Sequence, residues 1–137
     1  MLRDQIGPAM RLEGFVGAGS EWTLPDPDYL AMLGIQRSKF SNADLVRFTV
    51  NLRVTSRADW ITARSTSPLL PVWPKVNVHY SVEPGWTARI GKLMDEPRDH
   101  WWVLRVDEEP EPVASDVMAA IRSLAMPAIR DRMINAS

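Results

Sequence analysis

The clearest pattern in the chain is an alternation of apolar and polar side chains between residues 46 and 55. Its apolar members are Val46, Phe48, Val50, Leu52 and Val54, and its polar members are Arg47, Thr49, Asn51, Arg53 and Thr55. Successive side chains of a strand point to opposite faces of a sheet, so this segment predicts a half-buried β-strand. Residues 41–44 have the composition of a turn and predict a hairpin with the preceding strand.

Shorter stretches with the same period of two predict the rest of a sheet. Further strands are expected at residues 21–24, 29–36, 76–83, 86–90 and 101–106. Gly34 interrupts the second of these, and we interpret it as a bulge or a point of close approach. Residues 67–75 contain three prolines and are expected to form an irregular surface connection.

Helical spacing of apolar residues appears in three other segments. Helices are expected at residues 2–13, at about 57–65, and from 113 to about 129. Ser56 and Asp59 fit a capping box at the start of the short helix. Pro8 should kink the first helix or mark its beginning, and Pro127 should kink the last one near its end.

These elements predict an α+β domain of two layers. Its sheet would be mostly antiparallel, with about five to six strands, and the N- and C-terminal helices would pack on one face. The other face of the sheet would be polar and accessible. A chain of 137 residues has the usual length of one domain, so residues 1–137 are expected to form a single domain.

Composition and charge exclude several classes of function. Sixteen basic and seventeen acidic residues give a net charge of −1, which is not the charge of a nucleic-acid or membrane-surface binder. The absence of cysteine excludes disulfides, thiolate catalysis and cysteine-ligated metals. No apolar run has the form of a signal peptide or a membrane helix, so we expect a cytoplasmic protein.

No catalytic or metal-binding motif appears in the sequence. Neither His79 nor His100 has a nucleophile and an orienting carboxylate at a motif spacing, so His79 is interpreted as a solvent-facing strand residue in preference to a catalytic base. The acidic segments 95–99 and 107–111 lack the spacing of zinc or EF-hand sites. We therefore expect no metal and no cofactor, and the sequence favours a non-enzymatic protein.

Tryptophan is the one unusual component, with six residues. Core packing accounts for most such residues, whereas a binding surface is the alternative, because tryptophan and arginine are common anchors there. Trp101 and Trp102 are adjacent in a predicted strand and must point to opposite faces. One of them is therefore expected beside the polar face.

Six segments, distributed in order along nearly the whole chain, together resemble a known family. They are Gly14-Phe15, Leu33 to Ser38, Arg47 to Leu52, Gly85 to Gly91, Asp99 to Leu104, and the final helix. Together they resemble a bacterial family catalogued as domain of unknown function 4304. The resemblance implies no activity, but it indicates that Gln36, Asn51, Arg89 and Trp102 belong to the family pattern.

Two interpretations of Gln36, Asn51, Arg89 and Trp102 remain open. The polar side chains could pair with one another or with exposed strand backbone and fix the strand register. Alternatively, an amide, a guanidinium and an indole on one face could bind a small polar ligand or a partner's carboxylate. The sequence slightly favours the structural interpretation.

The first function hypothesis is a non-enzymatic binding or interaction module that uses the polar face of the sheet. An immunity- or antitoxin-like protein is one concrete form of it, by analogy with other small domains. The alternative is a small enzyme or ligand sensor with a pocket around His79, Arg89 and Trp102. The expected partner is a protein or a small polar ligand, with neither nucleic acid nor a membrane, and the sequence leaves the oligomeric state open.

Overall fold

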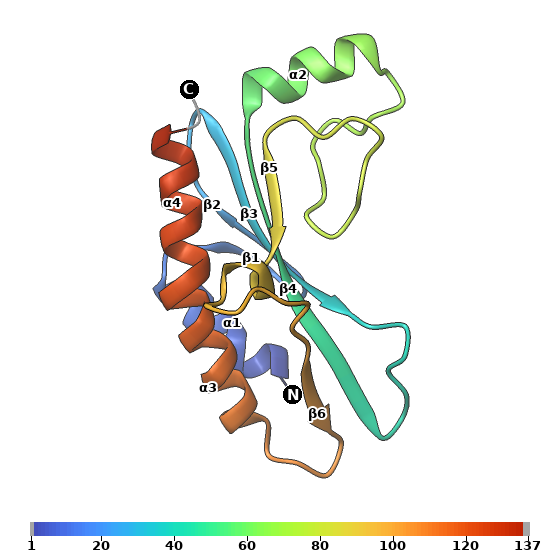
Figure 1. Cartoon of the computed structure of the whole chain (residues 1–137), viewed down its shortest axis with the longest axis vertical. Helices are drawn as coiled ribbons and strands as arrows, with labels where there is room; N and C mark the ends of the chain where they lie inside the picture. The colour runs from blue at the N-terminus through green and yellow to red at the C-terminus, as the bar shows by residue number, and fades with distance from the viewer. Residues whose placement is uncertain (1, 136–137) are drawn as a thin grey trace.

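The computed structural model describes residues 2–135 and shows an open antiparallel sheet with helices beside it (Figure 1). In chain order the elements are α1 (Leu2–Leu12), β1 (Val16–Ala18), β2 (Glu21–Leu24), β3 (Tyr29–Arg37), β4 (Leu45–Ser56), α2 (Arg57–Thr66), β5 (Trp86–Arg89), the 3-10 helix η1 (Ile90–Leu93), β6 (Trp102–Arg105), α3 (Pro110–Ala120), the π-helical turn η2 (Ile121–Ala125) and α4 (Met126–Asn135). The predicted α+β class and the antiparallel sheet are confirmed, with six strands among the described residues.

Strand β4 is the centre of the sheet. The strands follow one another in the order β1-β2-β3-β4, and every neighbouring pair is antiparallel. On its other edge β4 pairs twice, with β5 through residues 51–54 and with β6 through residues 45–48. Between these two partners, residues 90–101 leave the sheet. Both edges of β4 are therefore occupied over most of its length.

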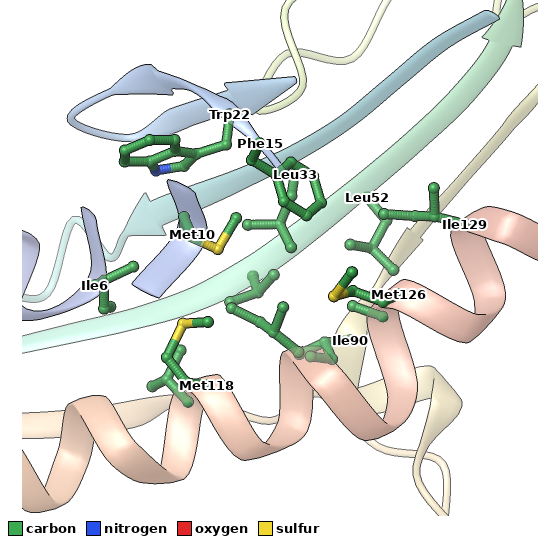
Figure 2. Close-up of a cluster of buried hydrophobic side chains, with 14 of the residues drawn as sticks. Ile6, Met10, Phe15, Trp22, Leu33, Leu52, Ile90, Met118, Met126 and Ile129 are labelled. Carbon is green, nitrogen blue, oxygen red and sulfur yellow. The ribbon is translucent and has the colours of Figure 1, made fainter. Parts of the chain in front are cut away.

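One face of the sheet, called the first face, carries the main hydrophobic core. The alternating residues Leu33, Val50 and Leu52 point into it, and all three are buried. Side chains of α1, α3, η2 and α4 belong to the same cluster, as Figure 2 shows for Met10, Met118 and others. Burial of this apolar surface, at roughly 25 cal/mol per Å², is the main source of stability for such a layer.

The opposite face, called the second face, is covered, and the expectation of an accessible polar surface is wrong. Thr49, Asn51, Arg53 and Thr55 point to this face, and each is at most 9% exposed. Most of the cover is the strap, our name for residues 67–85, which crosses β3 and β4 without regular structure, whereas Thr49 contacts His100. Polar side chains of β4 are therefore enclosed between the sheet and the strap.

The strand predicted at residues 76–83 is not formed, because this segment belongs to the strap. The alternation of apolar and polar residues in this segment does not divide it into a buried and an exposed face. Val76 is buried against the sheet, whereas Val78 and Val82 are more than one third exposed. No edge of β4 is open to it, since β5 holds residues 51–54. The irregular connection predicted at residues 67–75 is confirmed.

Helix α2 and the strap form a small second core. Trp60 is fully buried there, packs edge to face on Tyr80, and donates from Nε1 to the carbonyl oxygens of Pro71 and Val72. Ser56 caps the helix by accepting from the backbone N–H of Asp59 at 2.9 Å, so that half of the predicted capping box is confirmed. This core fixes the start of the strap.

The remaining helices depart from expectation only locally. Pro8 lies inside α1 and therefore does not mark the beginning of the helix. The last helical segment is divided by the π-helical turn η2, which ends just before Met126-Pro127. Because Pro127 has no N–H for the carbonyl of Ser123, regular α-helical bonding is interrupted there. No helix in the described part of the chain is long and apolar enough to span a membrane.

Candidate functional site

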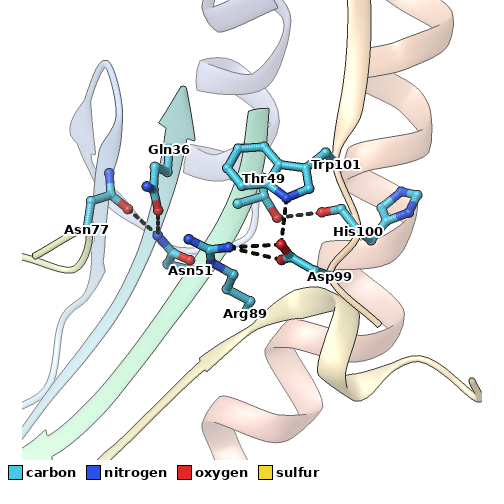
Figure 3. A network of polar contacts seen from close by, with 8 residues as sticks. All are labelled: Gln36, Thr49, Asn51, Asn77, Arg89, Asp99, His100 and Trp101. Carbon is cyan, nitrogen blue, oxygen red and sulfur yellow. Dashed lines mark hydrogen bonds and ion pairs between the residues drawn. The ribbon is translucent and has the colours of Figure 1, made fainter. Parts of the chain in front are cut away.

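An amide network joins the strap to the second face. Asn51 donates from Nδ2 to Oε1 of Gln36 at 2.7 Å and to Oδ1 of Asn77 at 3.0 Å (Figure 3). Asn77 in turn donates from its own Nδ2 to the carbonyl oxygen of Ile35 at 3.1 Å. The middle of the strap is therefore hydrogen-bonded to both β3 and β4.

A charged cluster lies at the other side of Asn51, where β5 ends. Arg89 is paired with Asn51 in the sheet register, and its Nη1 lies 3.0 and 3.2 Å from the two carboxylate oxygens of Asp99. Its guanidinium also stacks over the ring of Trp101, 5.1 Å from the centroid. Trp101 donates from Nε1 to Asp99 at 2.9 Å. Three side chains from two segments thus hold one another.

These contacts set the charge of Asp99. The hydrogen bond from Trp101 and then the one from Arg89 lower the pKa of this carboxyl below its ordinary value of 3.8. Both bonds favour the ionised form. The group is half exposed, so solvent screens part of the attraction. Asp99 is therefore a carboxylate that is already engaged with a neighbouring cation.

The gap between β5 and β6 is bridged by a hydrogen bond from a side chain of β4. Thr49 lies on β4 between the residues that pair with β5 and those that pair with β6. Its hydroxyl donates to the carbonyl oxygen of His100 at 2.7 Å (Figure 3). This bond holds the end of the excursion formed by residues 90–101, and so it helps to place Asp99 and Trp101 on the second face.

A cavity of about 430 Å³ opens on the second face beside these groups. Its polar lining comprises Asn51, Arg53, His79, Thr87, Arg89, Lys92 and Asp99. The volume falls in the range of pockets that hold small molecules. Lys92 makes no hydrogen bond or salt bridge with another described residue, and its charge faces the cavity together with that of Arg89. The lining carries more positive than negative charge.

Arg53 lies at the base of this cavity and is only 1% exposed. Its Nη2 donates to the carbonyl oxygen of Val78 at 3.1 Å, and its Nη1 lies 2.9 Å from Oε2 of Glu83. The ion pair lacks the alignment of a hydrogen bond, which leaves Nη1 without an acceptor, and Nε is also buried without an acceptor among the described residues. Tyr80 covers the guanidinium at 5.4 Å.

The structure brings together three of the four residues predicted as binding positions. Gln36, Asn51 and Arg89 share the second face, and Gln36 is bonded to Asn51 as the structural interpretation supposed. Trp102 is on the first face, where it is 6% exposed and stacks on Phe48. The expectation of a pocket around His79, Arg89 and Trp102 is therefore wrong for Trp102. His79 and Arg89 line the cavity, and Trp102 does not.

Sequence reasoning missed Arg53, Lys92, Asp99 and Trp101 as members of this site. The alternation in residues 46–55 predicts Arg53 only as a solvent-facing residue of a strand. The available signal was the apolar content of the segment that became the strap, which required a surface to pack against. That signal indicates a covered face but does not say which polar residues lie beneath.

A second concave surface lies on the first face, beyond the helices. A groove of about 670 Å³ runs between the β1–β2 turn and the start of α3. Its apolar part includes Ile35, Val46 and Leu104, and exposed Arg37 and Arg105 stand at its rim. Neither guanidinium forms a salt bridge with another described residue.

Comparisons with known proteins give one match. A family model described as "Domain of unknown function (DUF4304)" matches residues 6–131. No curated protein and no solved structure matches the chain. In the described part of the chain, no group of three or more histidine, aspartate or glutamate side chains is arranged to hold a metal ion.

Proposed function

The chain belongs to the DUF4304 family, and from this premise we propose that it is a non-enzymatic binding domain which holds a small anionic ligand in the second-face cavity. The observation that carries the proposal is the convergence of His79, Arg89 and Lys92 on one cavity whose lining residues include a single carboxylate. That carboxylate, Asp99, is already engaged by Arg89 and Trp101. Because Arg89 and Asp99 offset each other's charge, an anion entering the cavity would meet the charge of Lys92, which forms no salt bridge with another described residue.

Binding is favoured over catalysis by the surroundings of His79. This residue is exposed, and no described hydroxyl or carboxylate forms a hydrogen bond with it. A general base needs a reacting group within reach and usually an orienting partner. The proposal thus keeps the binding part of the ligand-sensor hypothesis. From the sequence we also expect the protein to be bacterial and cytoplasmic.

The test is a titration of the ¹⁵N-labelled protein with inorganic phosphate, sulfate, succinate and citrate, followed by NMR. At least one of these anions should shift the amide resonances of residues 87–92 in a saturable manner. Lys92→Ala should weaken that binding about tenfold, because it removes one charge-assisted contact. Lys39→Ala removes the same charge from the exposed β3–β4 hairpin and should leave binding unchanged. Absence of saturable shifts with every anion would refute the proposal.

The groove on the first face supports a second candidate function, recognition of a protein partner. The floor formed by Ile35, Val46 and Leu104 is apolar. Arg37 and Arg105 add positive charge at the rim and outnumber the single acidic lining residue, Glu108, which accepts from the backbone N–H of Arg105. The partner that fits is a segment with apolar side chains flanked by acidic ones. An immunity- or antitoxin-like complex is one form that such recognition would take.

Selection of a displayed peptide library on the protein tests this second candidate. Enriched peptides should combine apolar residues with aspartate or glutamate, and Leu104→Lys should abolish their binding. Lys92 lies outside the groove, so Lys92→Ala serves as the control and should leave peptide binding unchanged. Peptides of basic character, or binding that survives Leu104→Lys, would overturn it.

A further inference from the structure

We propose that Arg53 is the deep subsite of the second-face cavity and that it binds a ligand carboxylate in the place now taken by Glu83. This inference rests on the proposed anion-binding function and names its ligand class, a small dicarboxylate. It goes further by assigning to Glu83, which contacts Arg53 without lining the cavity, the role of an internal competitor for that guanidinium.

The first argument is that two nitrogens of a buried guanidinium lack a hydrogen bond within the described part of the chain, although Glu83 balances its charge. Arg53 is 1% exposed, yet its Nε and Nη1 have no hydrogen-bond acceptor among the described residues. A buried donor left without a partner is costly, and an unfilled ligand position is one of the recognised explanations. The guanidinium fork matches a carboxylate in a bidentate manner, which a single ion pair with Glu83 does not use.

The second argument is the position of Glu83. It lies near the end of the strap and is still 30% exposed, while its partner Arg53 is enclosed. Its other carboxylate oxygen accepts from the backbone N–H of Tyr80, two residues after Val78, which also contacts Arg53. The carboxylate is thus held by a segment without regular structure. A competing carboxylate would need to displace only this part of the strap.

The third argument is the spacing of positive charge across the cavity. Arg53 pairs with Thr87 in the sheet register, and Asn51 pairs with Arg89. Arg53 and Arg89 are therefore diagonal neighbours on one face, with backbone positions about 7–8 Å apart. Lys92 lies beyond Arg89 on the same cavity. Two cationic positions, one deep and one at the rim, suit a molecule with a carboxylate at each end.

The experiment compares succinate binding by the wild-type protein, Glu83→Gln and Glu111→Gln with isothermal titration calorimetry. Glu83→Gln removes the internal competitor and should tighten succinate binding by about fivefold to tenfold. Glu111→Gln makes the same change of charge on α3, outside the cavity, and should bind as the wild type does. Butyrate, with one carboxylate, should bind more weakly than succinate to all three proteins.

The outcomes separate this inference from the proposed function. If the wild type binds succinate and Glu83→Gln binds it equally well, the inference is overturned while the anion site stands. If neither protein binds any of the anions, the proposed function fails as well. In the wild type, the Nε–Hε resonance of Arg53 should shift on addition of succinate, which tests the subsite without a substitution. A resonance that does not move at saturation would overturn the subsite even if Glu83→Gln proved unstable.

Discussion

Asn77 of the strap lies directly above Gly34 of β3. A β-carbon at residue 34 would stand 2.5 Å from Oδ1 of Asn77 and closer still to Cγ1 of Val76. The strap can approach the sheet this closely only because residue 34 has no side chain. The close approach that the sequence suggested at Gly34 is therefore real, and it is what allows Asn77 to reach Asn51 and Ile35.

Gly34→Ala should therefore displace the strap. Overpacking of a buried contact typically costs about 1–3 kcal/mol, and we expect a loss of free energy of unfolding in that range. Urea denaturation measures it, and hydrogen exchange should show faster exchange of the strap amides. Gly7→Ala is the matched control. A β-carbon at Gly7 meets only ordinary contacts with Arg11 and Trp22, but residue 7 precedes Pro8, whose ring disfavours a β-carbon before it in a helix. This change should therefore leave exchange of the strap amides unaltered, with a change in the free energy of unfolding below about 1 kcal/mol. Equal effects of the two substitutions would contradict this account of the strap.

The adjacent tryptophans of the β6 region should differ sharply in their effect on stability. Trp102 is buried, stacks on Phe48, and donates from Nε1 to Asp116 at 2.8 Å. Trp102→Ala should cost about 3–5 kcal/mol in urea denaturation. Trp101 is half-buried and stacks with Arg89, so Trp101→Ala should cost about 1 kcal/mol. A larger loss for Trp101→Ala would show that the faces are assigned wrongly.

This pair shows where sequence reasoning ended. The alternation of strand side chains establishes that Trp101 and Trp102 point to opposite faces. Which of them enters the core depends on the register, in which Trp102 lies opposite Phe48. Register is a relation between segments more than fifty residues apart, and neither segment contains it alone. The indole chosen from the sequence was therefore the core residue, and the one beside Arg89 was its neighbour.

The difference between a local pattern and a relation between distant segments also explains which strands of the sheet could be predicted. Strands β2, β3, β4, β5 and β6 were predicted because each has a local pattern of its own. The strap has a similar pattern at residues 76–83, but a strand also needs a free edge to pair with. β5 occupies that edge of β4. The second-face cavity depends on the path of the strap, so its position could not be read from the sequence.

Asp99 provides a prediction about pH. Its pKa is lowered first by the hydrogen bond from Trp101, so Trp101→Phe should raise the pKa of Asp99 toward the ordinary value of 3.8. The carboxyl resonance of Asp99, followed by NMR against pH, measures this shift. Trp73→Phe changes an exposed tryptophan that stacks with Arg57 and should leave the titration unaltered.

The sign of the stability effect follows from the direction of that shift. Because folding lowers the pKa of Asp99, its contribution is fully present above pH 3.8 and is lost as the pH falls through the lowered value. The difference in stability between the wild type and Asp99→Asn should therefore be constant near neutral pH and shrink in acid. A difference that grows as the pH falls would contradict the assignment.

The last prediction concerns the donor that holds the strap. Asn51 uses its amide N–H groups, which bond to Gln36 and Asn77. Asn51→Asp replaces this donor by an acceptor. Asn77 cannot answer by turning its amide, because its own Nδ2 is bonded to the carbonyl oxygen of Ile35. Acceptors would then face one another in a buried position, and we expect a loss of about 1–3 kcal/mol in urea denaturation, with faster exchange of the strap amides.

Asn42→Asp is the control, because it makes the same substitution at a side chain whose amide oxygen accepts hydrogen bonds. In the turn before β4, Oδ1 of Asn42 accepts from the backbone N–H groups of Asp44 and Leu45. Aspartate keeps that acceptor, and the site is exposed, so the stability should change by less than about 0.5 kcal/mol. If both substitutions were equally tolerated, the amide network would not be what holds the strap against the sheet. The burial of Arg53 would then have to depend on the Trp60 core and the Glu83 contact alone.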